Sequence, residues 1–182
     1  MRRRRAFTLA EVLIALAIVA TMAAVLYPAL SAQLRRGQSA ATANGLSNLR
    51  DAIVAYRGNV LRYPRTLSLL TNAPVVGATD ACGNVLSAAQ RNSWRGPYLS
   101  QNISGSLAIG DGTGLDTLVR NPVTDVVVAP GTLILRVINV DSTVAVDIDR
   151  QFDGNVDLTA GTITWSTIGL DTLKFNILIR NC

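Results

Sequence analysis

The sequence predicts an α+β fold, in which one long N-terminal helix packs on an antiparallel β-sheet domain. Residues 12–34 are nearly all apolar and carry no formal charge, and residues 46–60 then place an apolar side chain at every third or fourth position. Later segments alternate apolar and polar residues, which is the pattern of half-buried strands. With 182 residues, the chain is long enough for one compact domain with one appendage.

The apolar run of residues 12–34 predicts a membrane-spanning helix. Its 23 residues form a helix of about 34 Å, enough to cross a hydrocarbon core of roughly 30 Å. Arg2 to Arg5 precede the run, and Arg35 and Arg36 follow it. Because the denser basic cluster marks the cytoplasmic side, we expect a cytoplasmic N-terminus and an exported remainder in a single-pass protein of the bacterial inner membrane. A cleaved secretory signal fits less well, since its apolar core spans about 7–15 residues.

The soluble part of the helix is predicted from the residues that follow. Its apolar stripe consists of Leu46, Leu49, Ile53, Tyr56 and Val60. We therefore expect one helix over residues 8–56, which ends near Gly58 and Asn59, with Pro64 preventing its continuation. Pro28, inside the apolar run, lacks a backbone donor and is expected to kink or locally melt the helix.

The C-terminal part of the chain is predicted to be β. The expected strands cover residues 123–129, 132–140, 143–149, 161–165 and 173–180, in two of which the apolar side chains alternate cleanly. Residues 66–114 are rich in Gly, Ser, Thr and Asn, and no elements are assigned to them. Within that region, residues 111–114 are expected to form a loop, and Trp94 and Tyr98 are expected to pack under the long helix rather than form a stacking surface.

Charge and residue usage exclude several classes of function. Of 17 basic side chains, four lie in the N-terminal cluster, which leaves 13 against 12 acidic ones, so no nucleic-acid partner is expected. The chain has no histidine, and its serines and acidic residues form no recognisable catalytic arrangement, so we do not expect an enzyme.

Cys82 and Cys182 match no zinc or redox motif. In an exported domain they are expected to form a disulfide, with two buried thiols as the alternative.

Glu11 is the charge that a plain membrane anchor does not explain. A carboxylate in the bilayer costs about 2.5–3.5 kcal/mol near the centre and less near the interface, so it usually has a partner or a function. No arginine further along the helix can reach Glu11 within the bilayer. The partner must therefore come from elsewhere.

Residues 5–16, with the sequence RAFTLAEVLIAL, resemble the signal of the type IV pilin and type II secretion pseudopilin family. In that family, prepilin peptidase removes a short basic leader before a Phe and the new amino group is methylated. The resemblance implies cleavage between Ala6 and Phe7 and N-methylation of Phe7, and here Ala6 stands where most members have Gly. It implies a leader at 1–6, a transmembrane and polymerisation helix at 7–34, and an exported pilin-like domain at 35–182.

The same resemblance supplies a partner for Glu11. In the family this glutamate pairs with the free amine of Phe7 on a neighbouring subunit during assembly, which implies a homo- or hetero-polymer of pilin-like subunits built on an inner-membrane assembly platform. Pro28 also matches a family feature. Because both charges would lie in a medium of low dielectric, the pair would favour one register between subunits.

Two further strings resemble type II secretion pseudopilins: the Arg62-Tyr63-Pro64 element after the helix and the string WRGPYL at residues 94–99. They imply a pseudopilin-like subunit that takes part in protein export. The later D-P-W-G-N-P-Y element is absent, and the cysteine pair is more pilin-like, so a major or minor type IV pilus subunit for adhesion, motility or DNA uptake remains the alternative. A third hypothesis is a membrane-anchored binding or enzymatic domain that never polymerises.

Four aspartates suggest a calcium site: Asp147, Asp149, Asp153 and Asp157. Counted from Asp149, aspartates fall at positions 1, 5 and 9 and a glycine at position 6 of an EF-hand-like loop, but the bidentate glutamate at position 12 is missing. Calcium is therefore a possible cofactor, and a solvated turn between two strands is the alternative.

Overall fold

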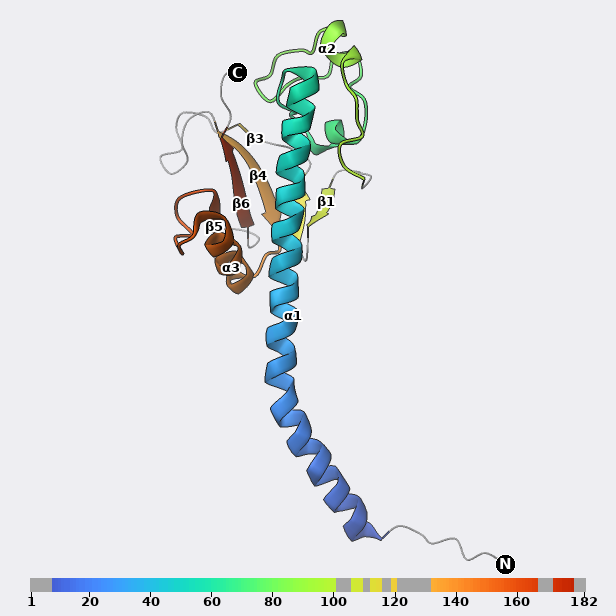
Figure 1. Ribbon diagram of the computed structural model, residues 1–182, viewed down its shortest axis with the longest axis vertical. Helices are drawn as coiled ribbons and strands as arrows, with labels where there is room; N and C mark the ends of the chain where they lie inside the picture. The colour runs from blue at the N-terminus through green and yellow to red at the C-terminus, as the bar shows by residue number, and fades with distance from the viewer. Residues whose placement is uncertain are drawn as a thin grey trace, which may run out of the picture. The chain divides into compact units, whose positions relative to one another are not determined.

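A computed structural model describes residues 8–100, 106–109, 112–115, 119–120, 132–166 and 172–178 (Figure 1). It divides into two compact units, the first ending at Gly37 and the second covering residues 38–182. One helix, α1 (Leu9–Val60), contributes to both units. The predicted strand at 123–129 lies outside the described residues, as do the leader, the cleavage site and Cys182.

Helix α1 is continuous, as predicted, and continues through Pro28. Proline cannot donate the hydrogen bond of its turn, and the Ser31 hydroxyl donates to the Pro28 carbonyl at 2.9 Å in the turn that follows. Around Pro28 most side chains of α1 are apolar, and intrahelical hydrogen bonds satisfy the backbone groups. A membrane-spanning segment must meet both of these conditions.

The end of α1 differs from the prediction. The helix continues past Gly58 to Val60, and the left-handed residue that ends it is Leu61, with φ of 60°. The Leu61 N–H donates to the Arg57 carbonyl at 2.8 Å. Glycine usually occupies such a position because it has no Cβ, but here Tyr56 and Val60 are fully buried, so packing of the last turn on the core sets where the helix ends.

Two short helices occupy the region that the sequence left unassigned. They are η1 (Leu67–Leu70), a 3₁₀ helix, and α2 (Ala88–Asn92), which begins with a capping box between Ser87 and Gln90. The Trp94 indole N–H donates to the Leu69 carbonyl at 3.0 Å, and the Tyr98 N–H donates to the Leu70 carbonyl at 2.7 Å. These bonds hold residues 94–98 against η1.

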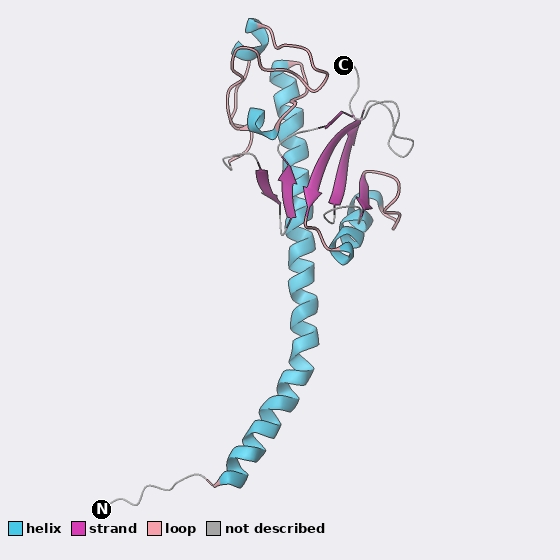
Figure 2. Cartoon of the chain, turned by 180° about the vertical axis from the view of Figure 1, so that it is seen from behind, coloured by secondary structure: helices cyan, strands magenta, loops and turns pink. Residues whose placement is uncertain are grey.

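The described strands form one antiparallel sheet. They are β1 (Ser106–Ile109), β2 (Gly112–Leu115), β3 (Val119–Arg120), β4 (Thr132–Ile138), β5 (Ile163–Ser166) and β6 (Thr172–Leu178). Their order is β1-β2-β4-β6-β5, with β3 paired to β4 (Figure 2). Strands β4 and β6 pair along their whole length, from Thr132 opposite Leu178 to Ile138 opposite Thr172. The strands predicted at 132–140, 161–165 and 173–180 are therefore confirmed within the described residues, although β4 ends at Ile138 and β5 begins at Ile163.

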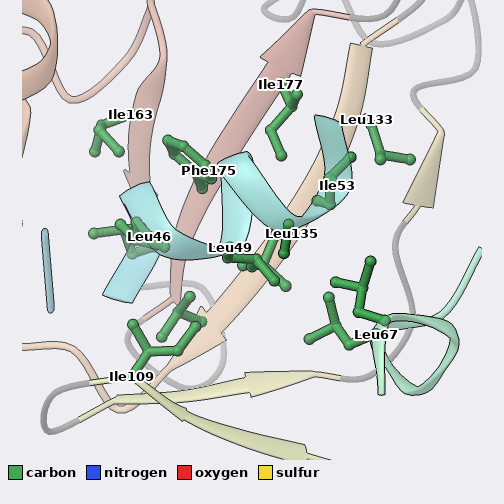
Figure 3. Packing of buried hydrophobic residues seen from close by; sticks show 14 of the residues in the cluster. Leu46, Leu49, Ile53, Leu67, Ile109, Leu133, Leu135, Ile163, Phe175 and Ile177 are labelled. Atoms are coloured by element: carbon green, nitrogen blue, oxygen red, sulfur yellow. The ribbon is translucent and has the colours of Figure 1, made fainter. Parts of the chain in front are cut away.

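The second half of α1 covers one face of this sheet, which confirms the α+β prediction. Its whole apolar stripe, from Leu46 to Val60, is fully buried. Figure 3 shows Leu46, Leu49 and Ile53 of α1 lying over Leu135 of β4 and Phe175 of β6. Each fully buried leucine or isoleucine contributes about 1.5–3 kcal/mol relative to exposure, so this contact stabilises the second unit.

The prediction of a strand at 143–149 was wrong. These residues belong to α3 (Ser142–Asp153), a helix capped by Asp141 at its start and by Gly154, in the left-handed conformation, at its end. Val144, Ala145 and Ile148 are its buried apolar residues, a helical spacing that two-residue alternation had obscured. Phe152 at its end contacts Phe175 of β6 edge to face, with ring centroids 5.4 Å apart.

The prediction of a loop at 111–114 was also wrong, because β2 begins at Gly112 and pairs with β1 and β4. Strand β1 approaches α1 closely at Gly45, where an added Cβ would lie 3.0 Å from a methyl group of Ile109. The small residue on the helix therefore lets the sheet edge pack against it.

Candidate functional site

The first unit presents an apolar helix surface. Every residue from 8 to 30 is exposed, including Leu13, Leu16 and Met22 at 58%, 60% and 61%. In the described part of the chain, α1 is the one helix whose length and composition suffice to cross a membrane. Exposed apolar surface of this extent is unfavourable in water and favourable in lipid.

Glu11 lies in the first turn of this helix and caps it. The Thr8 N–H donates to Glu11 Oε2 at 2.9 Å, the Thr8 hydroxyl donates to the same oxygen at 3.0 Å, and the Glu11 N–H donates to the Thr8 hydroxyl at 3.3 Å. This is a reciprocal capping box, which satisfies backbone donors that a helix start leaves open. The Thr-x-x-Glu spacing of Thr8 and Glu11 is the sequence signal from which this cap can be predicted.

The capping box provides hydrogen bonds to the carboxylate but no positive charge. Glu11 forms no ion pair with any residue that the structure describes, and Val12, Ala15 and Val19 surround it on the helix surface. In a membrane, this acidic group would therefore have its hydrogen bonds partly satisfied while its charge stayed uncompensated within the described chain.

The four candidate calcium ligands do not form a metal site. Among the described residues, no group of three or more acidic, cysteine or histidine side chains is placed to hold a metal ion. Three of the four aspartates lie in α3 rather than in a turn between strands. The Asp149 carboxylate accepts the Asp157 N–H at 2.7 Å, and the Asp153 carboxylate accepts the N–H groups of Thr162 and Ile163 at 2.8 and 3.0 Å. Their oxygens thus hold the α3–β5 connection in place.

The pKa values of Asp149 and Asp157 are shifted in opposite directions by their surroundings. Burial is the main reason that the pKa of Asp149 is raised, and the neighbouring Asp153 carboxyl adds to it, while the Asp157 N–H acts in the opposite direction. One buried oxygen of Asp149, Oδ1, has no hydrogen-bond partner. In contrast, the hydroxyl and N–H of Thr159 donate to exposed Asp157 and lower its pKa.

Asp147 interacts with α1 and with its own helix, α3. It accepts a hydrogen bond from the Ser39 hydroxyl of α1 at 3.3 Å and lies 3.5 Å from the Arg150 guanidinium. Its role is therefore to join α3 to α1.

The two strings that resemble pseudopilins serve the packing of the second unit. Arg62 lies 3.8 Å from the carboxylate of buried Asp80, and the Tyr63 carbonyl accepts the Ala81 N–H at 2.9 Å. Tyr98 contacts Tyr56 edge to face at 5.8 Å, which confirms its packing against α1. Burial, with Tyr98 and Asp80 nearby, raises the pKa of Tyr56 to about 12, so this phenol stays neutral at physiological pH.

A comparison with family models matched residues 1–27, which include the capping box and the first part of the apolar helix. The matching model is the prokaryotic N-terminal methylation motif. The chain carries the N-terminal signal of the type IV pilin and pseudopilin family. No curated protein and no solved structure matched the chain.

This pilin-type signal, at residues 1–27, indicates the general class of the chain. Proteins with it are processed by prepilin peptidase, are anchored in a membrane by the apolar helix and assemble in the manner of pili. They are structural subunits and not enzymes. The pilin-like arrangement of a long helix on an antiparallel sheet agrees with that role.

Proposed function

We propose that this chain is a pseudopilin-like subunit of a type II secretion system, which assembles into a short periplasmic filament that drives protein export. The observation that carries the proposal is Glu11, an acidic residue among exposed apolar side chains and without a positive partner in the described chain. The strings at residues 62–64 and 94–99 favour secretion over a pilus. A major or minor type IV pilus subunit is the second candidate, and the two cysteines favour it.

The processing and topology that accompany this proposal are specific. Prepilin peptidase would cut between Ala6 and Phe7 on the cytoplasmic side, Phe7 would be methylated, and residues 35–182 would lie in the periplasm. Mass spectrometry of the mature N-terminus tests this directly. A protein that begins at Met1, with no trimmed form, would overturn the proposal and leave a membrane-tethered domain.

The assembly step is tested by two variants of Glu11. Glu11→Ala removes both the charge and the cap, whereas Glu11→Gln keeps an oxygen that can accept the Thr8 N–H and removes only the charge. We expect both variants to remain in the membrane fraction and to lower the yield of filaments in isolated cell envelopes at least about tenfold, since each leaves the amine of Phe7 on the neighbouring subunit unpaired. Filaments of Glu11→Gln at the wild-type level would show that the cap matters and the charge does not.

Secretion and pilus roles are separated by the phenotype of a deletion strain. Loss of proteins from the culture medium, with no change in surface filaments seen by electron microscopy, supports the pseudopilin. Loss of surface filaments, motility or DNA uptake with normal secretion supports the pilus subunit. Neighbouring secretion genes or pilus genes provide the same distinction.

The cysteine pair is a further part of the proposal. A disulfide between Cys82 and Cys182 would close a loop of about a hundred residues, worth about 4–5 kcal/mol in the chain-entropy model. Alkylation of the unreduced exported protein, followed by mass spectrometry, is expected to label neither cysteine. Labelling of both would contradict the pairing.

A further inference from the structure

Helix α1 has a basic flank in the second unit. Arg50 and Arg57, seven residues apart and therefore on one face of the helix, line a groove of about 230 Å³ between α1 and β6. Val54 lies between them and is 60% exposed, and Ile177 of β6 forms part of the opposite wall. Neither arginine pairs with an acidic group in the described residues, although the Arg57 guanidinium lies 4.8 Å from the centroid of the Tyr63 ring.

A second groove, of about 410 Å³, lies on another face of the same helix. Asp51, Ala55 and Asn48 line it from α1, and Tyr98 and Ser100 line it from the segment before the sheet. Successive helical residues are rotated by about 100°, so Asp51 points away from the face of Arg50. We call these two surfaces the basic flank (Arg50, Val54 and Arg57) and the acidic flank (Asp51 and Ala55).

Asp51 differs from the other acidic residues that the structure describes. Each of those has a partner: for example, Asp80 pairs with Arg62, Asp147 pairs with Arg150, and Asp141 accepts from Thr143. Asp51 has neither a hydrogen bond nor an ion pair in the described chain. An exposed acid on one flank and two exposed arginines on another therefore have no partner of opposite charge in the described chain.

We propose that these two flanks join successive copies of this chain, with Asp51 of one copy between Arg50 and Arg57 of the next and Ala55 packed against Val54. The occupant of each flank is a second copy because the same helix carries both signs of charge on different faces. A contact between two different patches is heterologous, so it repeats without closing and builds a filament rather than a dimer. Small side chains on the acidic flank leave room for two guanidinium groups, which bind carboxylates in planar, forked geometry. This inference rests on the proposed filament function.

Charge reversal in the full-length protein tests the contact. Asp51→Arg, and separately the double variant Arg50→Glu with Arg57→Glu, are each expected to lower the yield of filaments in isolated cell envelopes about tenfold, because attraction becomes repulsion. The triple variant that combines them exchanges the signs of the two flanks and is expected to recover filaments to within about threefold of wild type. Arg65→Glu, an exposed arginine outside both grooves, is the control and should leave the yield unchanged.

The outcomes separate this contact from the proposed function. If Glu11→Ala abolishes filaments while all the reversals assemble like wild type, the contact is overturned and the filament function stands. If the triple variant is as defective as its parts, the pairing is overturned. Wild-type protein that retains Met1 and never forms filaments would overturn both. The melting temperature of each variant, which we expect to stay at the wild-type value, shows that the fold is unaffected.

Discussion

Residues 9–37 and residues 38–60 belong to one helix and both repeat leucine, isoleucine and valine, but they bury them differently. Leu16 in the first part is 60% exposed, whereas Leu49 in the second part is fully buried against the sheet. In the first part, leucine can be removed from water only by lipid or by other subunits. In the second part, the chain's own domain buries it. Helical periodicity alone does not separate the two cases. The difference lies in what surrounds the stripe: apolar residues all round in the first part, and polar residues opposite the stripe in the second.

The largest expected effect is a difference in stability between leucine substitutions in the two parts of α1. Leu49→Ala should lower the free energy of unfolding of the second unit by about 2–5 kcal/mol, because it leaves a cavity beneath α1. Leu16→Ala, with the same change in side chain, should alter that free energy by less than about 0.5 kcal/mol. Denaturant unfolding of both variants in detergent micelles measures the difference. Equal destabilisation would mean that the first part also packs within the chain.

The second prediction compares two glycines of α1. Gly45→Val should destabilise the second unit by about 1–3 kcal/mol, because its Cβ meets the Ile109 methyl group at 3.0 Å and the added branch overpacks the contact with β1. Gly37 has no atom within 4 Å of an added Cβ, so Gly37→Val should change the unfolding midpoint little. The same micelle measurement tests both, and an unchanged midpoint for Gly45→Val would show that β1 lies further from α1.

The third and smallest effect compares two carboxylates. Because the pKa of Asp149 is raised in the folded state, its contribution to stability is fully present below the unfolded value of about 3.9 and is lost as pH rises through the folded pKa. Asp149→Asn can still accept the Asp157 N–H and can donate to Asp153, so the variant should melt at a higher temperature than wild type at pH 7. This advantage should vanish at pH 3.

Glu11 is expected to show the opposite behaviour, with an effect on assembly and none on the melting of the second unit. Thermal unfolding of Asp149→Asn and Glu11→Gln at pH 3 and pH 7 compares the two, and Asp51→Asn, exposed and without a partner in the described chain, is the control. An Asp149→Asn protein less stable than wild type at pH 7 would contradict the assigned cause of the pKa shift.

The parts of the fold that were predicted correctly have long or locally unambiguous patterns. The 3.6-residue period from Leu46 to Val60 persists over four turns. In β6, apolar Leu173, Phe175 and Ile177 alternate with polar residues, whereas β4 is a nearly continuous apolar run interrupted by Arg136. The error at 143–149 arose because Val144, Val146 and Ile148 also alternate at a period of two. Asp141 as N-cap and Gly154 as C-cap, with the twelve residues of α3 between them, were the signals that favoured a helix.

The candidate functional residues also include a group that local sequence identified and a group that it did not. Phe7, Glu11 and the basic leader lie within a few residues of one another, so the local sequence alone indicated the pilin-type signal that the motif match then identified. The calcium interpretation assumed that the backbone between the ligands forms a loop, but three of the four aspartates lie in helix α3. Helix α3 instead uses those carboxylates to bind backbone N–H groups.

The sequence by itself determined the membrane-anchoring helix, its misplaced charge and the processing signal, because each depends on neighbouring residues and on the solvent. Only the tertiary structure decided where α1 ends, that Gly112 begins a strand and which charges remain free on the flanks of the helix. Those outcomes depend on contacts between segments up to about a hundred residues apart, such as Ser39 with Asp147. At these positions the helix propensity of a residue, worth less than about 1 kcal/mol, is outweighed by the burial of a whole side chain, worth about 1.5–3 kcal/mol.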